Sequence, residues 1–150
     1  MKKIISFALI LTMLVCVIPI CGNAAENQKE TIYFDDGSYM TVEINTIRTR
    51  ASGSVSGSKP YTYYGSDGVA KWKATLSGSF TYNGSSATCT SSSVDVTIYD
   101  STWHTDSKSA SKSGNTATAS VTMKKTQLGI TVKTVPISLS MSCDKDGNLS

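Results

Sequence analysis

His104 is the residue with the clearest potential for chemistry, because it is the only histidine of the chain and lies in Ser-Thr-Trp-His-Thr-Asp at 101–106. A histidine beside Asp106 could act as a general base for a serine nucleophile. Serine is so abundant here that closeness to one carries no information, and no Gly-x-Ser-x-Gly elbow is found. We therefore expect no catalytic residue, and a small hydrolase using His104 stays an alternative.

Tyr99, Trp103 and His104 lie where a predicted strand ends and a loop begins. Aromatic faces can bind the C–H groups of a sugar, while Ser and Thr hydroxyls can bind its polar edges. We take these three residues as candidate binding residues. Ordinary packing of strand aromatics is the alternative.

Metal-ligand patterns are weak. The segment Asp-Lys-Asp-Gly-Asn at 144–148 resembles the beginning of a calcium loop but lacks the closing glutamate. A terminal turn explains it better. One histidine and two remaining cysteines do not suggest zinc. The sequence predicts no metal and no cofactor.

Of four cysteines, Cys16 and Cys21 should leave with a predicted signal peptide at 1–25, and Cys89 and Cys143 remain. An even number of cysteines in an exported protein favours a disulfide. Both residues fall in the inward register of their predicted strands, so we expect them to pair across the interior. Such a bridge would raise the free energy of unfolding by roughly 4 kcal/mol in the chain-entropy model. Two buried thiols are the alternative.

These residues must be positioned by strands, since no helical period extends beyond one turn after residue 25. Apolar and polar residues alternate with a period of two, which buries one face of each strand. Gly78 is expected to interrupt one of these runs, and 107–113 reads as a polar strand or loop. The clearest strands are expected at 60–64, 69–76, 80–82, 87–89, 94–98, 116–123, 128–132 and 135–143.

Short strands separated by turn signals predict an all-β, antiparallel β-sandwich of immunoglobulin-like or Greek-key architecture. The order Cys89, Trp103, Cys143 mimics immunoglobulin domains. The mimicry is incomplete, because Met141 stands where a corner tyrosine is expected.

The first 25 residues are predicted to be a signal peptide. Lys2 and Lys3 precede an apolar run, and Asn-Ala-Ala at 23–25 offers a cleavage site. A retained membrane anchor and a lipoprotein acylated at Cys21 are alternatives, although bulky Ile20 disfavours the lipoprotein. Secretion to the extracellular space is the favoured interpretation, with no membrane contact after signal cleavage.

The remaining chain divides by composition into two parts. Residues 26–58 comprise a polar leader, a short hairpin around Asp35-Asp36-Gly37-Ser38 and a Ser/Gly-rich linker. Residues 59–150 are predicted to form the β-sandwich domain. Without Lys2 and Lys3 the formal net charge falls from +3 to +1. No cluster of Lys and Arg suits successive phosphates, so nucleic acid is not an expected partner.

Several segments of the chain resemble a family of small, uncharacterised secreted proteins of Gram-positive (clostridial) bacteria from gut and rumen. The segments that carry the resemblance are Tyr-Phe-Asp-Asp-Gly-Ser-Tyr at 33–39, Tyr-Thr-Tyr-Tyr at 61–64, Phe-Thr-Tyr-Asn-Gly-Ser-Ser-Ala-Thr-Cys at 80–89 and Ser-Ala-Ser-Lys-Ser-Gly-Asn-Thr-Ala-Thr-Ala at 109–119. The resemblance implies export and a single domain. No activity and no functional residue come with it.

Together these observations predict a secreted protein that acts by binding rather than catalysis. The expected role is an extracellular interaction module with a cell-envelope or other extracellular partner, for which a glycan is one candidate. A secreted antagonism or peptide-handling accessory protein is an alternative.

Overall fold

The computed structural model describes residues 29–48 and 53–150, in which every regular element is a β-strand. The predicted signal peptide at 1–25 lies outside these residues. No helix of the described part is long and apolar enough to cross a membrane. The strands are β1 (Lys29–Tyr33), β2 (Tyr39–Glu43), β3 (Asn45–Arg48), β4 (Ser54–Tyr64), β5 (Ala70–Tyr82), β6 (Ala87–Ile98), β7 (Trp103–Ser113), β8 (Thr116–Gln127) and β9 (Ile130–Ser142).

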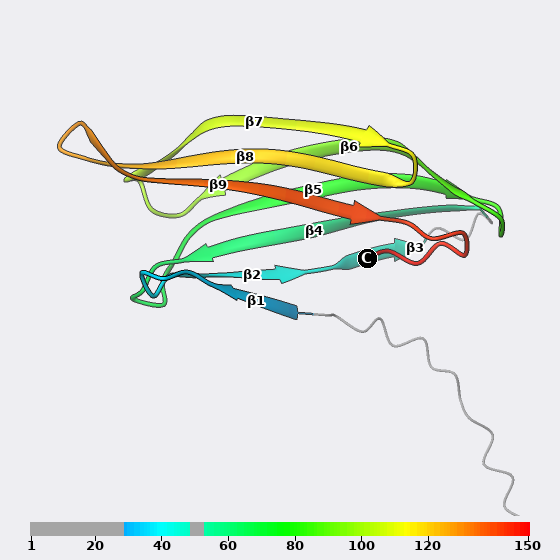
Figure 1. Cartoon of the computed structure of the whole chain (residues 1–150), viewed down its shortest axis with the longest axis horizontal. Helices are drawn as coiled ribbons and strands as arrows, with labels where there is room; N and C mark the ends of the chain where they lie inside the picture. The colour runs from blue at the N-terminus through cyan, green and yellow to red at the C-terminus, as the bar shows by residue number, and fades with distance from the viewer. Residues whose placement is uncertain (1–28, 49–52) are drawn as a thin grey trace, which may run out of the picture.

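These strands form two antiparallel sheets (Figure 1). Sheet A has the order β1-β2-β4-β5-β6, with β3 paired to β4, and sheet B has the order β7-β8-β9. The prediction of an all-β, antiparallel fold is confirmed. The connections are simpler than the immunoglobulin-like or Greek-key arrangement that the sequence allows, since described strands follow their neighbours along the chain as a meander.

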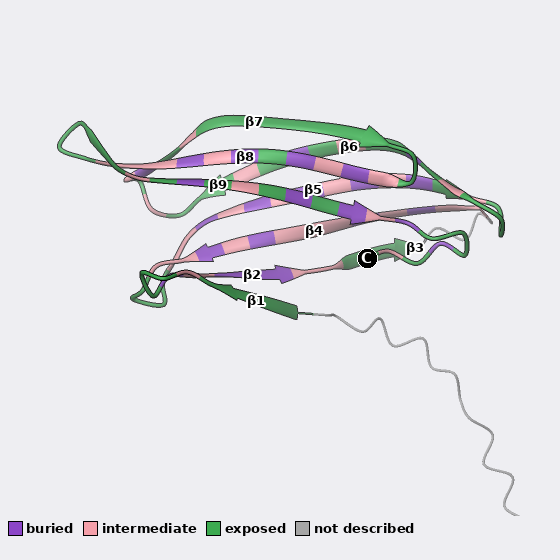
Figure 2. Ribbon diagram, in the orientation of Figure 1, coloured by how far each residue is buried: buried purple, intermediate pink, exposed green. Residues whose placement is uncertain are grey.

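One hydrophobic core lies between the two sheets. Burial alternates along β4, β5 and β8, so one side chain in two faces inward (Figure 2). Trp72 on β5 stacks on Tyr63 of β4 with ring centroids 5.0 Å apart, and Trp103 from β7 lies 6.2 Å from Trp72. These three aromatic rings join both sheets at one end of the sandwich.

The N-terminal hairpin forms as predicted and is part of sheet A. β1 pairs with β2 around the turn at Gly37, whose φ of 78° suits glycine. β2 in turn pairs with β4. Lys133 of β9 forms an ion pair with Asp36 in the hairpin turn and donates a hydrogen bond to Tyr63 Oη at 2.7 Å. The hairpin is therefore tied to both sheets.

Three local expectations differ from the structure. Residues 54–58, expected in a flexible linker, begin β4, so the boundary at residue 58 falls inside a strand. β5 continues through Gly78 without interruption, and β7 begins at Trp103, which was expected in a loop. Composition favours a flexible chain in these segments, but neighbouring strands satisfy their backbone groups on each side of β4 and β5.

The predicted Cys89–Cys143 disulfide is not formed, because both residues are buried thiols. Cys89 Sγ donates to Ser91 O at 3.2 Å, and Cys143 Sγ donates to Asp144 O at 3.4 Å. An inward register places both side chains in the core but does not make their strands neighbours. Across the sandwich β6 packs against β8, whereas β9 packs against β5.

Candidate functional site

The three candidate binding residues do not form one surface. Trp103 is only 4% exposed and belongs to the core, packed edge-on against Tyr63 with ring centroids 5.3 Å apart. Tyr99 is exposed in the β6–β7 connection, and His104 is exposed on β7. The placement of Trp103 in a loop is wrong, because Trp103 begins β7 and fills the end of the sandwich.

The pairing of His104 with Asp106 is also not assembled. Asp106 forms an ion pair with Lys124 on β8, with Nζ and Oδ1 2.8 Å apart. A register shift between Thr105 and Ser107 changes the backbone course between the two residues. No hydrogen bond or ion pair to the His104 imidazole is found among the described residues.

The acidic turn at 144–148 is held by its own hydrogen bonds. Asp144 Oδ1 accepts from the amides of Asp146 and Asn148 at 2.9 and 2.8 Å, and its Oδ2 accepts from Asn148 Nδ2 at 2.8 Å. Donation by Asn148 lowers the pKa of the Asp144 carboxyl. Within the described ranges no three His, Cys, Asp or Glu residues are grouped as metal ligands.

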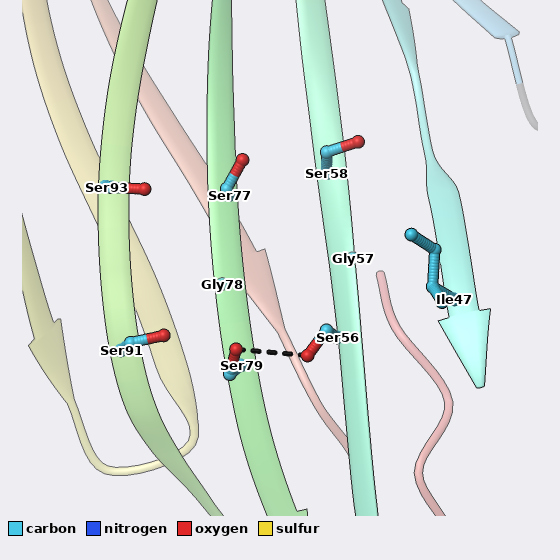
Figure 3. A pocket seen from close by; sticks show the side chains of 9 residues that line it. All are labelled: Ile47, Ser56, Gly57, Ser58, Ser77, Gly78, Ser79, Ser91 and Ser93. Carbon is cyan, nitrogen blue, oxygen red and sulfur yellow. Dashed lines mark hydrogen bonds between the residues drawn. The ribbon is translucent and has the colours of Figure 1, made fainter. Parts of the chain in front are cut away.

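A different site emerges on the outer face of sheet A. Two Ser-Gly-Ser segments, 56–58 on β4 and 77–79 on β5, lie side by side in antiparallel register. β6 continues both rows, giving Ser56–Ser79–Ser91 and Ser58–Ser77–Ser93. We call the hollow above these six residues the serine groove. Its volume is about 450 Å³, and Ile47 lies at its margin (Figure 3).

The spacing of the serine groove follows from β geometry. Neighbouring strands are about 4.8 Å apart and alternate residues of one strand about 6.7 Å apart. The six hydroxyls thus form two rows of three. Ser56 and Ser79 share a hydrogen bond of 3.0 Å between their Oγ atoms. The other four side chains have no hydrogen bond to another serine of the groove, which leaves their hydroxyls available to a ligand.

Gly57 and Gly78 determine how closely the two sheets can approach at this point. They pair with each other and face inward, between the outward-facing serines. A Cβ at Gly78 would lie 3.0 Å from Met141 Cε and 3.1 Å from Ala117 Cβ of sheet B. The missing side chains let sheet B approach closely on the inside, while small serine side chains line the hollow on the outer face.

Three tyrosines extend the outer face toward the other end of β4. Tyr33, Tyr39 and Tyr64 are paired in register across β1, β2 and β4, and we call them the tyrosine ladder. Tyr39 and Tyr64 stack with centroids 4.7 Å apart and an interplanar angle of 9°. Tyr33 at the sheet edge is 77% exposed. Because side chains of one parity share a face, Tyr64 lies on the same face as Ser58 and Ser56.

Electrically the serine groove is neutral. All the residues that line it are Ser, Gly or Ile. Lys59 is adjacent in sequence but has the opposite parity to Ser58, and burial lowers the pKa of its ammonium group. The groove therefore offers hydroxyl donors and acceptors with no fixed charge.

The serine groove was not predicted from the sequence. The repeated Ser-Gly-Ser motif was visible, but composition assigned its first copy to a linker. Only the register of β4 against β5 brings the two copies together. A serine at every second position on three consecutive segments is the signal that could have found it.

The fold and the groove define an all-β, sandwich-type protein with a polar, uncharged outer face. No family model matches the chain, and no relative is found among curated proteins. The resemblance to clostridial secreted proteins thus stays a prediction. Among solved structures, the chain is similar to the crystal structure of a hypothetical protein, lmo2686, from Listeria monocytogenes EGD-e. The identity is 15% and the TM-score 0.47, over 81% of this chain and 90% of that chain.

Proposed function

We propose that this protein is a secreted, non-catalytic binding module whose ligand is a neutral glycan bound along the outer face of sheet A. The observation that carries the proposal is the serine groove, in which six hydroxyls form two rows on three adjacent strands. The basic n-region and apolar run at the N-terminus support export.

The chemistry of the serine groove suits a polyhydroxylated, uncharged ligand. Each serine hydroxyl both donates and accepts, as a sugar hydroxyl does. A phosphate or sulfate ligand would need the positive charge that the lining lacks. A lipid chain would need an apolar lining, and only Ile47 supplies one.

The tyrosine ladder supports a chain of sugars rather than a single one. Tyr64 and Ser58 are six residues apart on β4, which corresponds to about 20 Å of extended strand. Thr62 and Pro60 lie between them on the same face. Tyr33 leaves most of its ring in solvent and can stack on the C–H face of a sugar.

The test is a glycan array with the purified protein, followed by calorimetry with the strongest neutral oligosaccharide. A double variant, Ser58→Ala with Ser77→Ala, removes two of the four hydroxyls that bond to no other serine of the groove. We expect at least about tenfold weaker binding, because each hydrogen bond contributes on the order of 1 kcal/mol. Tyr33→Ala should weaken longer oligosaccharides more than short ones.

Ser109→Ala is the matched control, since Ser109 is an exposed serine on β7, outside the serine groove. The affinity of Ser109→Ala for the neutral oligosaccharide should equal that of the parent protein. Absence of binding to every neutral glycan would refute the proposal. Binding that the double variant retains in full would place the ligand elsewhere.

A further inference from the structure

The β8–β9 hairpin ends in an apolar tip that the fold does not use. Leu128 and Gly129 form its two-residue turn with φ of 50° and 78°. Leu128 is fully exposed at 102%, and Ile130 and Val132 are 68% and 51% exposed. The hairpin reaches farther along the long axis than the other loops at its end of the molecule (Figure 1). These three side chains form the hairpin tip.

Turn chemistry does not explain the leucine. Left-handed φ at the first position of a two-residue hairpin favours Asn, Asp or Gly. Leu128 is the sole non-glycine residue with positive φ in the described ranges. Other turns of the same protein place a polar residue before the glycine, as in Asp36-Gly37, Asp67-Gly68, Asn83-Gly84 and Asp146-Gly147.

Packing does not explain the leucine either, because its side chain is in solvent. A strained residue that the fold does not need is a pointer to function. Behind the tip the hairpin is firmly held. Thr126 donates from its amide to Thr102 O at 2.9 Å, which ties the hairpin to the β6–β7 connection.

Polarity changes in steps away from the tip. Behind Leu128 the Gln127–Ile130 pair comes first and the Thr126–Thr131 pair second, and Val132 and the Lys125–Lys133 pair follow. Lys133 is engaged by Asp36, whereas Lys125 forms no ion pair within the described residues. An apolar leading residue with a cation behind it matches the order of acyl chains and phosphates in a bilayer.

We propose that the hairpin tip inserts into the surface of a lipid bilayer, with Leu128 leading and Lys125 at the level of the phosphates. A bilayer accepts a convex apolar tip of any shape. A second copy of the chain is a poorer occupant, because specific interfaces involve roughly 20–30 residues a side and the tip offers three. This contact is peripheral and independent of the serine groove.

The test is cosedimentation of the full-length protein with phosphatidylcholine vesicles, with and without phosphatidylglycerol. The protein should partition into both and more strongly into the anionic vesicles. Leu128→Asn should reduce partitioning about tenfold or more, because a leucine side chain is lost from the apolar phase. The same variant should be at least as thermostable as the parent, since Asn tolerates positive φ.

Three further variants keep the proposal falsifiable. Leu128→Met should keep partitioning within about threefold, as a rescue that preserves apolar character. Lys125→Gln should remove most of the preference for phosphatidylglycerol while leaving binding to phosphatidylcholine. Leu128→Trp should show a blue-shifted emission change with vesicles.

No partitioning of the parent protein, or equal partitioning of Leu128→Asn, overturns the proposal. A concentration-dependent increase in sedimentation coefficient that Leu128→Asn abolishes would assign the tip to self-association instead.

Discussion

Lys133 Nζ lies 2.7 Å from Tyr63 Oη and 5.3 Å from the centroid of the same ring. Tyr63 is buried against Trp72 and Trp103, the aromatic residues that join the two sheets. The Lys133 ammonium group of sheet B therefore contacts this aromatic cluster. The same ammonium group pairs with Asp36 in the β1–β2 turn. One side chain thus connects the N-terminal hairpin, the core and sheet B.

This connection predicts a pH dependence of stability. The hydrogen bond from Lys133 is the main reason that the pKa of Asp36 lies well below its ordinary value, and Ser38 adds to it. A carboxyl whose pKa is lowered by folding stabilises the fold above its unfolded pKa, and the effect is lost as pH falls below about 4. Urea unfolding of Asp36→Asn should therefore show a deficit at pH 7 that shrinks in acid.

Asp35→Asn is the matched control. Asp35 is the residue next to Asp36, and the Asp35 carboxylate forms no ion pair within the described residues. Its stability should follow that of the parent protein at each pH. A deficit in Asp36→Asn that stays constant from pH 7 to pH 2 would show that the ion pair does not stabilise the fold.

The period of two along the strands was enough to predict the antiparallel class and most inward residues. It worked for Trp72 and Leu139, which are buried where alternation places them. It could not say which strands face each other across the core. For this reason the disulfide between Cys89 and Cys143 was wrong, although both cysteines are buried.

Segments rich in Ser and Gly show the second limit of the sequence. Their local propensity is weak, so tertiary pairing decides their structure. Ser56 and Ser79 become a hydrogen-bonded pair only after β4 and β5 align. Trp103 was misplaced for a related reason, because the polar residues around it suggested a loop while β8 supplied a strand partner.

The core position of Trp103 predicts a large loss on truncation. Trp103→Ala should reduce the free energy of unfolding by about 3–5 kcal/mol, as removal of a buried aromatic side chain does. Trp103→Phe should cost less, because the indole N–H has no hydrogen-bond partner among the described residues. Urea denaturation measures both.

His104→Ala should change stability by no more than about 0.5 kcal/mol, because His104 is exposed. If Trp103→Ala were equally neutral, the indole would not contribute to the core.

The buried thiols predict a defined reactivity. Burial raises the pKa of Cys89, which keeps the thiol protonated and unreactive at neutral pH. In the native protein neither Cys89 nor Cys143 should react with a thiol reagent, and both should react in denaturant without reductant. Intact mass after alkylation measures the number of modified thiols. If alkylation in denaturant requires prior reduction, the two cysteines form the disulfide predicted from the sequence.

The inward face at Gly78 predicts the effect of filling the space between the sheets. Gly78→Val places methyl groups against Met141 and Ala117. Side-chain carbons of these two residues lie only about 3 Å from the position that a Cβ at residue 78 would take. Overpacking of this kind costs about 1–3 kcal/mol, although valine favours a strand. Ser93→Thr on the exposed outer face of β6 adds one methyl group away from sheet B and should stay within about 0.5 kcal/mol of the parent protein. Equal stability of the two variants in urea would mean that sheet B does not press on Gly78.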